Sequence, residues 1–187
     1  MIRRFWLSIS VFLAFGLAVH ADDKPADRIT LHVQVTGLFQ PDREADLRGV
    51  IETLPELTLV AIDYDRAELT VALNPAEVWP NEKPERYVEL LDNQLRNASR
   101  HTFGVRPLRA VALEKLQRVE IPIEGLDCKG CSYAAYLRVY ELPGVDRATA
   151  SFKSGKLVAF IDPDATGAAK LVEALKNGGV SVPEPKK

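Results

Sequence analysis

Cys128 and Cys131 are the only two cysteines of this 187-residue chain, and two residues separate them. A Cys-X-X-Cys spacing lets two sulfurs bind one ion, or form one small disulfide loop. So short a loop gives little chain-entropy stabilisation, which makes a structural disulfide a weak explanation for the pair. No His or further Cys lies near the two sulfurs in the sequence. Such a pair suits a soft ion that binds two ligands, such as Cu(I) or Hg(II), better than zinc, which usually takes four.

The predicted position of the pair favours thiolate chemistry. We expect Cys128 in the loop after a strand and Cys131 at the start of a helix. Free backbone N–H groups and the helix dipole stabilise negative charge there, and we expect Lys129 to add to this effect. The pKa of both thiols should therefore lie below that of a free cysteine. Metal binding, thiol redox chemistry and an inert local disulfide all remain open at this point.

An internal repeat indicates which elements position the cysteines. Two segments of the chain align without a gap through a strand, a turn and a helix, and the first copy then has about eight extra residues around 76–84. The aligned pairs include Leu31 with Val119, Gly37 with Gly125, and Pro55 with Pro143. We interpret the repeat as two homologous domains of one architecture.

Hydrophobic periodicity predicts the same order of elements in both copies. The strands alternate apolar and polar residues, and the helices carry one apolar stripe. The predicted segments are 29–36, 41–54, 57–64, 69–73, 85–98 and 102–105 in the first copy, and 118–124, 131–142, 145–152, 156–161, 166–177 and 180–182 in the second. This order predicts an α+β chain of two tandem ferredoxin-like βαββαβ sandwiches. Pro122 removes a backbone donor, so we expect a bulge or break in its strand.

The first residues are typical of a secretory signal peptide. An apolar run at residues 5–19 follows two arginines and is too short to span a bilayer comfortably, so we assign 1–21 as a signal. The remaining organisation is a domain at 28–108, a linker at 109–117, a domain at 118–182 and a disordered tail at 183–187. We therefore expect an exported, periplasmic protein with no membrane span after signal removal.

Composition narrows the class of protein further. The chain is 47% hydrophobic and 27% charged, which is ordinary for a globular protein. Its formal net charge is −2, and no block of Lys and Arg stands out. Nucleic-acid binding is therefore not expected.

The motif Gly125-Leu126-Asp127-Cys128-Lys129-Gly130-Cys131, followed by Leu142-Pro143-Gly144-Val145, resembles the heavy-metal-associated domain of copper chaperones, metal-pumping ATPases and mercury-scavenging proteins. The resemblance covers residues 118–182. It implies that Cys128 and Cys131 are the metal ligands, with Cys128 more exposed and Cys131 nearer the core. Asp127 resembles the version found in pumps for Zn(II), Cd(II) and Pb(II), and is a candidate third ligand because a carboxylate is a harder donor.

The first copy keeps the scaffold without the cysteines. Gln40 and Arg43 stand where the second copy has Cys128 and Cys131, and neither side chain can hold a soft cation. Residues 28–108 therefore resemble a degenerate heavy-metal-associated domain, to which we assign docking or structural work.

Other notable side chains have structural interpretations. We expect Tyr133, Tyr136 and Tyr140, which share one side of the helix after Cys131, to pack against the sheet or the other domain. Trp79 is expected to fold against its own domain, and the lone His32 and His101 are taken as structural.

The function expected from the sequence is an extracytoplasmic metal carrier or metallochaperone without catalytic activity. Cu(I) is the first choice of cargo, with Zn(II), Cd(II) or Hg(II) as alternatives, and a metal-donor or metal-acceptor protein is the expected partner. The alternative is a thiol redox or disulfide-bearing interaction module with no metal role.

Overall fold

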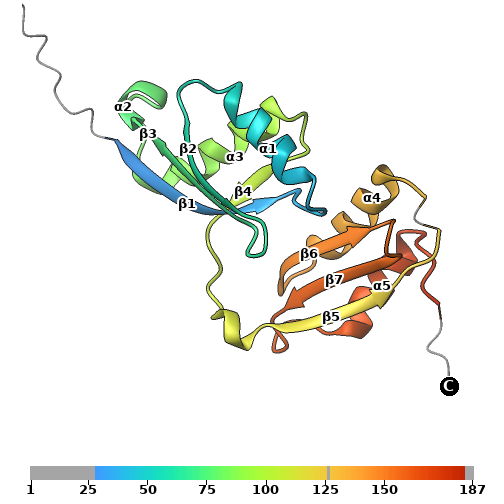
Figure 1. The fold of residues 1–187 in the computed structure, drawn as a ribbon. Coiled ribbons are helices and arrows are strands. Elements are labelled where there is room, and N and C mark those ends of the chain that lie inside the picture. Colours follow the sequence, from blue (N-terminus) through green and yellow to red (C-terminus); the bar gives the residue numbers. More distant parts are fainter. Residues whose placement is uncertain (1–27, 126, 184–187) are drawn as a thin grey trace, which may run out of the picture.

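The computed structural model describes residues 28–125 and 127–183. The predicted signal peptide and residues 184–187 of the predicted tail lie outside this part of the chain. Figure 1 shows two sandwiches, each with its own sheet and its own helices. Each sandwich also has its own cluster of buried hydrophobic side chains. Within the described ranges, no helix is long and apolar enough to cross a membrane.

The first unit has the predicted order of elements. They are β1 (Ile29–Thr36), α1 (Arg43–Glu52), β2 (Thr58–Asp63), β3 (Glu68–Leu73), α2 (Pro75–Val78), the 3-10 turn Pro84–Arg86, α3 (Tyr87–Ala98) and β4 (Gly104–Arg106). The strands form an antiparallel sheet in the order β2-β3-β1-β4. This is the ferredoxin-like arrangement, in which α1 and α3 bury Leu47 and Leu91 against the sheet.

The second unit repeats this topology with a smaller sheet. Its elements are the 3-10 turn Leu113–Lys115, β5 (Gln117–Pro122), α4 (Lys129–Tyr140), β6 (Val145–Ser151), β7 (Lys156–Ile161) and α5 (Ala168–Asn177). The antiparallel sheet has the order β5-β7-β6. The strand predicted at 180–182 is reduced to one isolated bridge, between Glu124 and Ser181.

The strand predicted at 118–124 ends at Pro122, so the expected break is confirmed, whereas the alternative, a bulge, is absent. Pro122 pairs with Lys156 in an unbroken register. The next residue, Ile123, donates its N–H to Gly155 on the β7 side, so the nitrogen of Pro122 faces the other edge of the strand. A missing donor on that edge leaves the ladder with β7 intact.

The first unit docks on the second through the segment that aligns with the cysteine motif. Phe39 is buried in the core of the second unit. Its carbonyl accepts the N–H of Ala150 at 3.0 Å, and Gln40 Nε2 donates to the carbonyl of Ala150 at 3.0 Å. Ala150 belongs to β6, an edge strand of its sheet, so this loop covers an edge that would otherwise be open.

Tyrosines of α4 form the other side of this junction, as predicted. The hydroxyl of Tyr136 accepts the N–H of Gly37 at 2.9 Å, and Tyr133 donates to the carbonyl of His101 at 3.2 Å. Gly37 has a φ of 95°, and a Cβ there would collide with the carbonyl of Thr102. The close approach therefore requires glycine at this position. The prediction for Trp79 is also confirmed, because its ring lies 5.3 Å from that of its own unit's Tyr87.

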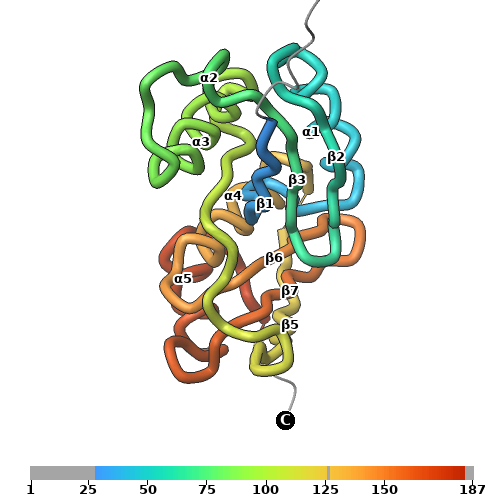
Figure 2. Tube along the Cα trace, turned by 90° about the vertical axis from the view of Figure 1, so that its left-hand side faces the viewer, coloured from blue at the N-terminus to red at the C-terminus, as the bar shows by residue number. Residues whose placement is uncertain are grey.

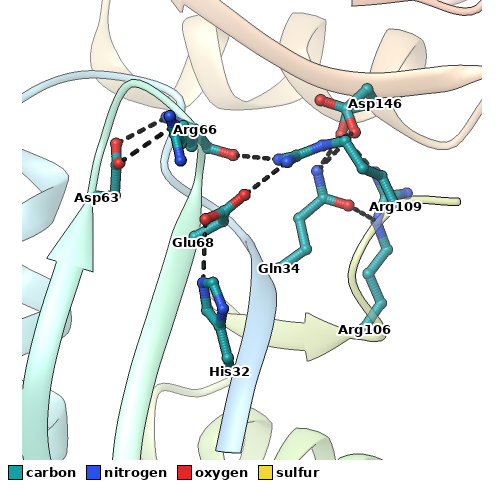
Figure 3. A network of polar contacts seen from close by, with 8 residues as sticks. All are labelled: His32, Gln34, Asp63, Arg66, Glu68, Arg106, Arg109 and Asp146. Atoms are coloured by element: carbon teal, nitrogen blue, oxygen red, sulfur yellow. Dashed lines mark hydrogen bonds and ion pairs between the residues drawn. The ribbon is translucent and has the colours of Figure 1, made fainter. Parts of the chain in front are cut away.

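A largely buried arginine at the start of the predicted linker connects both units (Figure 3). Arg109 pairs with Glu68 of the first unit at 2.5 Å and with Asp146 of the second at 2.7 Å. The three side chains are 12%, 8% and 4% exposed, respectively. Burial alone would lower the pKa of Arg109, but the hydrogen bonds to Asp146 and Glu68 raise it. Figure 2 shows the chain between β4 and β5 passing along one side of the second unit.

Replacing Tyr140 with Phe should not destabilise the protein at neutral pH. The Tyr140 ring packs under Arg106, whose guanidinium carbon lies 4.5 Å from the ring centroid, and Phe keeps this contact. The buried hydroxyl has no hydrogen-bond partner among the residues that the structure describes. Its removal should therefore leave the free energy of unfolding unchanged or raise it by about 1 kcal/mol.

The same variant should resist alkali better. Burial raises the pKa of Tyr140 from 10.0 to about 12. Because the pKa is higher in the folded protein, the associated stability is complete below pH 10 and is lost as the pH rises towards 12. Urea unfolding at pH 7 and pH 11 should show a smaller alkaline loss in Tyr140→Phe than in the wild type. Equal losses would contradict this account.

Candidate metal centre

The two cysteines lie at the N-terminus of α4, as predicted. Cys128 is the N-cap residue with an extended backbone (φ −151°), and Cys131 lies in the first helical turn. The Sγ of Cys128 accepts the backbone N–H of Cys131 at 3.2 Å, in the role that a Ser or Asp oxygen usually has at an N-cap. The sulfur therefore lies among the free N–H groups at the positive end of the helix.

The two sulfurs differ in burial in the predicted sense. Cys128 is exposed, whereas Cys131 is partly buried at the edge of the second unit's core. Both are free thiols rather than a disulfide. One sulfur therefore faces solvent while the other has a packed position.

The pKa values of the two thiols move in opposite directions. A hydrogen bond from the Cys131 thiol, followed by backbone N–H groups of Cys131 and Gly130, lowers the pKa of Cys128. Donation of that hydrogen bond to Cys128, together with burial, raises the pKa of Cys131. The prediction that both values fall is therefore right for Cys128 and wrong for Cys131. Of the two thiols, Cys128 is therefore the one that ionises first.

Lys129 does not support the Cys128 thiolate as predicted. Its ammonium pairs with the carboxylate of Asp42, immediately before α1 in the first unit. This hydrogen bond is the main reason that the pKa of Asp42 lies below 3.8. Lys129 thus neutralises a carboxylate of the neighbouring unit, and the Cys128 thiolate depends on Cys131 and on backbone donors.

Asp127 is exposed and precedes Cys128 directly. Its negative charge opposes ionisation of Cys128 and so acts to raise the pKa of that thiol. Within residues 28–125 and 127–183, no group of three or more His, Cys, Asp or Glu side chains is arranged to hold a metal ion. The structure therefore brings the two sulfurs together without placing the Asp127 carboxylate as a third ligand beside them.

The aligned positions of the first unit have packing roles. Gln40 is buried and bonds to Ala150, while Arg43 lies over the rings of Phe39 and Phe103 at 5.4 and 5.2 Å. Sequence reasoning predicted that Gln40 and Arg43 bind no metal, but it missed their contacts. One signal was present: Phe39 places a large apolar side chain at the turn position where the second copy has Asp127.

No protein-family model matches the sequence, and no curated protein sequence matches it. Several solved structures do. The CopZ metallochaperone is 19% identical over 36% of this chain and 100% of its own (TM-score 0.35). Oxidized MerP from Ralstonia metallidurans CH34 is 24% identical over 37% of this chain and 99% of its own, with a TM-score of 0.34. The water-soluble region of the P-type ATPase CopA from Bacillus subtilis is 17% identical over 84% of this chain and 91% of its own, with a TM-score of 0.34. All three TM-scores lie below 0.5, so these likenesses assign no function to this chain.

Proposed function

We propose that this protein is an exported, periplasmic carrier that binds one soft cation, Cu(I) in the first instance, between the sulfurs of Cys128 and Cys131. One observation carries the proposal: two free thiols lie together at a helix N-terminus, and one of them is exposed. Soft thiolate ligands select soft cations such as Cu(I). No catalytic step is part of the proposed function.

Each cysteine has its own part in binding. Cys128 ionises first and is open to solvent, so it makes the first bond to an arriving cation. Cys131 then loses its proton to become the second thiolate, since a metal ligand must be deprotonated. Two thiolates around one monovalent cation leave the site with a net negative charge, and the positive end of the helix dipole offsets that charge.

Release to an acceptor protein is proposed to proceed by ligand exchange. An incoming thiolate bonds to the cation before Cys128 or Cys131 leaves, so the cation is never without sulfur ligands. The exposure of Cys128 leaves room for that approach. Zn(II), Cd(II) or Hg(II) are alternative cargo, and Asp127 would have to move to serve a harder ion as a third ligand.

A thiol redox role is the second candidate, and the opposite pKa shifts favour it. A low-pKa, exposed Cys128 could attack a disulfide, and Cys131 could then resolve the mixed disulfide. Mass spectrometry of the exported protein separates the two functions. The carrier, once its metal is removed, has both thiol protons, whereas a stable loss of two hydrogen masses from the metal-free protein indicates the oxidised module.

Competition titration tests the carrier directly. The reduced protein is titrated anaerobically with Cu(I), Zn(II) and Hg(II) in the presence of a competing chelator. We expect one Cu(I) or Hg(II) per chain and much weaker binding of Zn(II), because two sulfurs leave zinc short of its usual four ligands. Failure to bind any of the three ions would contradict the proposed function.

A further inference from the structure

The helix that carries Cys131 faces the first unit along one continuous stripe. Lys129, Tyr133, Tyr136 and Tyr140 recur at spacings of three and four, so they lie on the same side of α4. Each of the four contacts the first unit: their partners, in order, are Asp42, the carbonyl of His101, the N–H of Gly37, and Arg106. The stripe begins at the residue immediately after Cys128.

The first two contacts of the stripe are the ones next to the sulfurs. Lys129 lies between the two cysteines, and its ammonium is bound to the carboxylate of Asp42. One turn further along, the hydroxyl of Tyr133 donates to the carbonyl of His101. The turn that bears both sulfurs is therefore tied to the first unit at its start and at the next helical turn.

The residues that make these contacts are themselves held in place. Asp42 lies between Gln40, which is anchored on β6, and Arg43, which is stacked on two phenylalanine rings. The loop of His101 is fixed by its own N–H, which donates to the carbonyl of Arg96 at 2.7 Å. Both contacts thus connect the cysteine turn to a docked support rather than to a free loop.

We propose that the cysteine-free first unit positions the metal centre of the second. Asp42 acts through Lys129, and the carbonyl of His101 acts through Tyr133, to keep the Cys128–Cys131 turn in its binding geometry and so slow release of the cation. The inference rests on the proposed function. Pulling the cation away displaces the turn that holds it, and the contacts of Lys129 and Tyr133 with the first unit oppose that displacement.

Two conservative variants of the full chain test this. Asp42→Asn removes the ion pair, and Tyr133→Phe removes one hydrogen bond while keeping the ring contact with Phe39. The measurement is the rate at which excess chelator removes Cu(I) from the loaded protein. Each variant should release Cu(I) about two- to fivefold faster, the range that follows from losing an exposed ion pair or one hydrogen bond. The stoichiometry should not change.

Two matched controls leave the junction intact. Glu44→Gln removes a carboxylate of α1 that pairs only with Arg48 of the same helix among the described residues. Tyr87→Phe removes a hydroxyl whose acceptor is Glu82 of its own unit. Both controls should release Cu(I) at the wild-type rate.

A double-variant cycle distinguishes positioning through Lys129 from a general structural effect. In a Lys129→Met background, Asp42→Asn should produce no further acceleration. An equal acceleration in both backgrounds would overturn the positioning role, as would wild-type release rates in Asp42→Asn and Tyr133→Phe. A wild-type chain that binds no Cu(I) would instead overturn the proposed function, so the two failures can be told apart.

Discussion

Replacing Cys128 with Ser will lower the affinity for Cu(I) at least about 100-fold, beyond the 10–100-fold loss typical when only a group supporting a ligand is removed. A hydroxyl is a poor ligand for a soft cation, and the one remaining thiolate cannot complete a two-sulfur site. Cys131→Ser should have a similar effect. Competition with a chromophoric Cu(I) chelator measures both affinities.

The fold of Cys128→Ser should survive, which makes the result interpretable. Cys128 is the N-cap of α4, and Ser is a favoured residue at that position, so the helix keeps a side-chain acceptor for the N–H of Cys131. Ser132→Ala is the matched control, because it changes the same turn without touching a sulfur. Cu(I) affinity within about tenfold of wild type in Cys128→Ser would argue against a shared two-thiolate site, since even a supporting group contributes that much.

Replacing Arg109 with Met will lower the free energy of unfolding by about 3–5 kcal/mol, the usual cost of breaking a buried ion pair from one side. The loss arises because Glu68 and Asp146 keep their charges in buried positions without the guanidinium that pairs with both. Urea denaturation at neutral pH measures the change.

Arg66→Met is the control for Arg109. Arg66 pairs with Asp63 at 3.7 Å, and both side chains are about half exposed. Its loss should cost less than about 1 kcal/mol, as for other surface ion pairs. Arg109→Lys provides an intermediate, because it keeps the charge but not the planar fork that reaches both carboxylates. Similar losses for Arg109→Met and Arg66→Met would mean that the network does not join the units as described.

The fold was largely predictable because the same local pattern occurs twice in the chain, once in each unit. Alternation in 29–36 and the apolar stripe of 131–142 determine which faces are buried, and the repeat doubles the evidence for the element order. The missing fourth strand of the second unit was not predictable in this way. Pro122 and the short segment 180–182 leave only one bridge, although the apolar pattern there is that of a strand.

The site was predictable in its ligands but not in its surroundings. A spacing of two residues places Cys128 and Cys131 in one turn, whatever the rest of the molecule does. The partner of Lys129 depends on a carboxylate from the other unit, far away in the sequence, and no local pattern indicates that contact. For the same reason, the opposite pKa shifts of the two thiols required the hydrogen bond between them to be known.

X-ray absorption spectroscopy of the Cu(I)-loaded wild-type protein at the copper edge shows which atoms bind the cation. We expect a first coordination shell of two sulfur atoms, contributed by Cys128 and Cys131 of one chain. A shell dominated by nitrogen or oxygen, or one that is unchanged in Cys128→Ser, would contradict it.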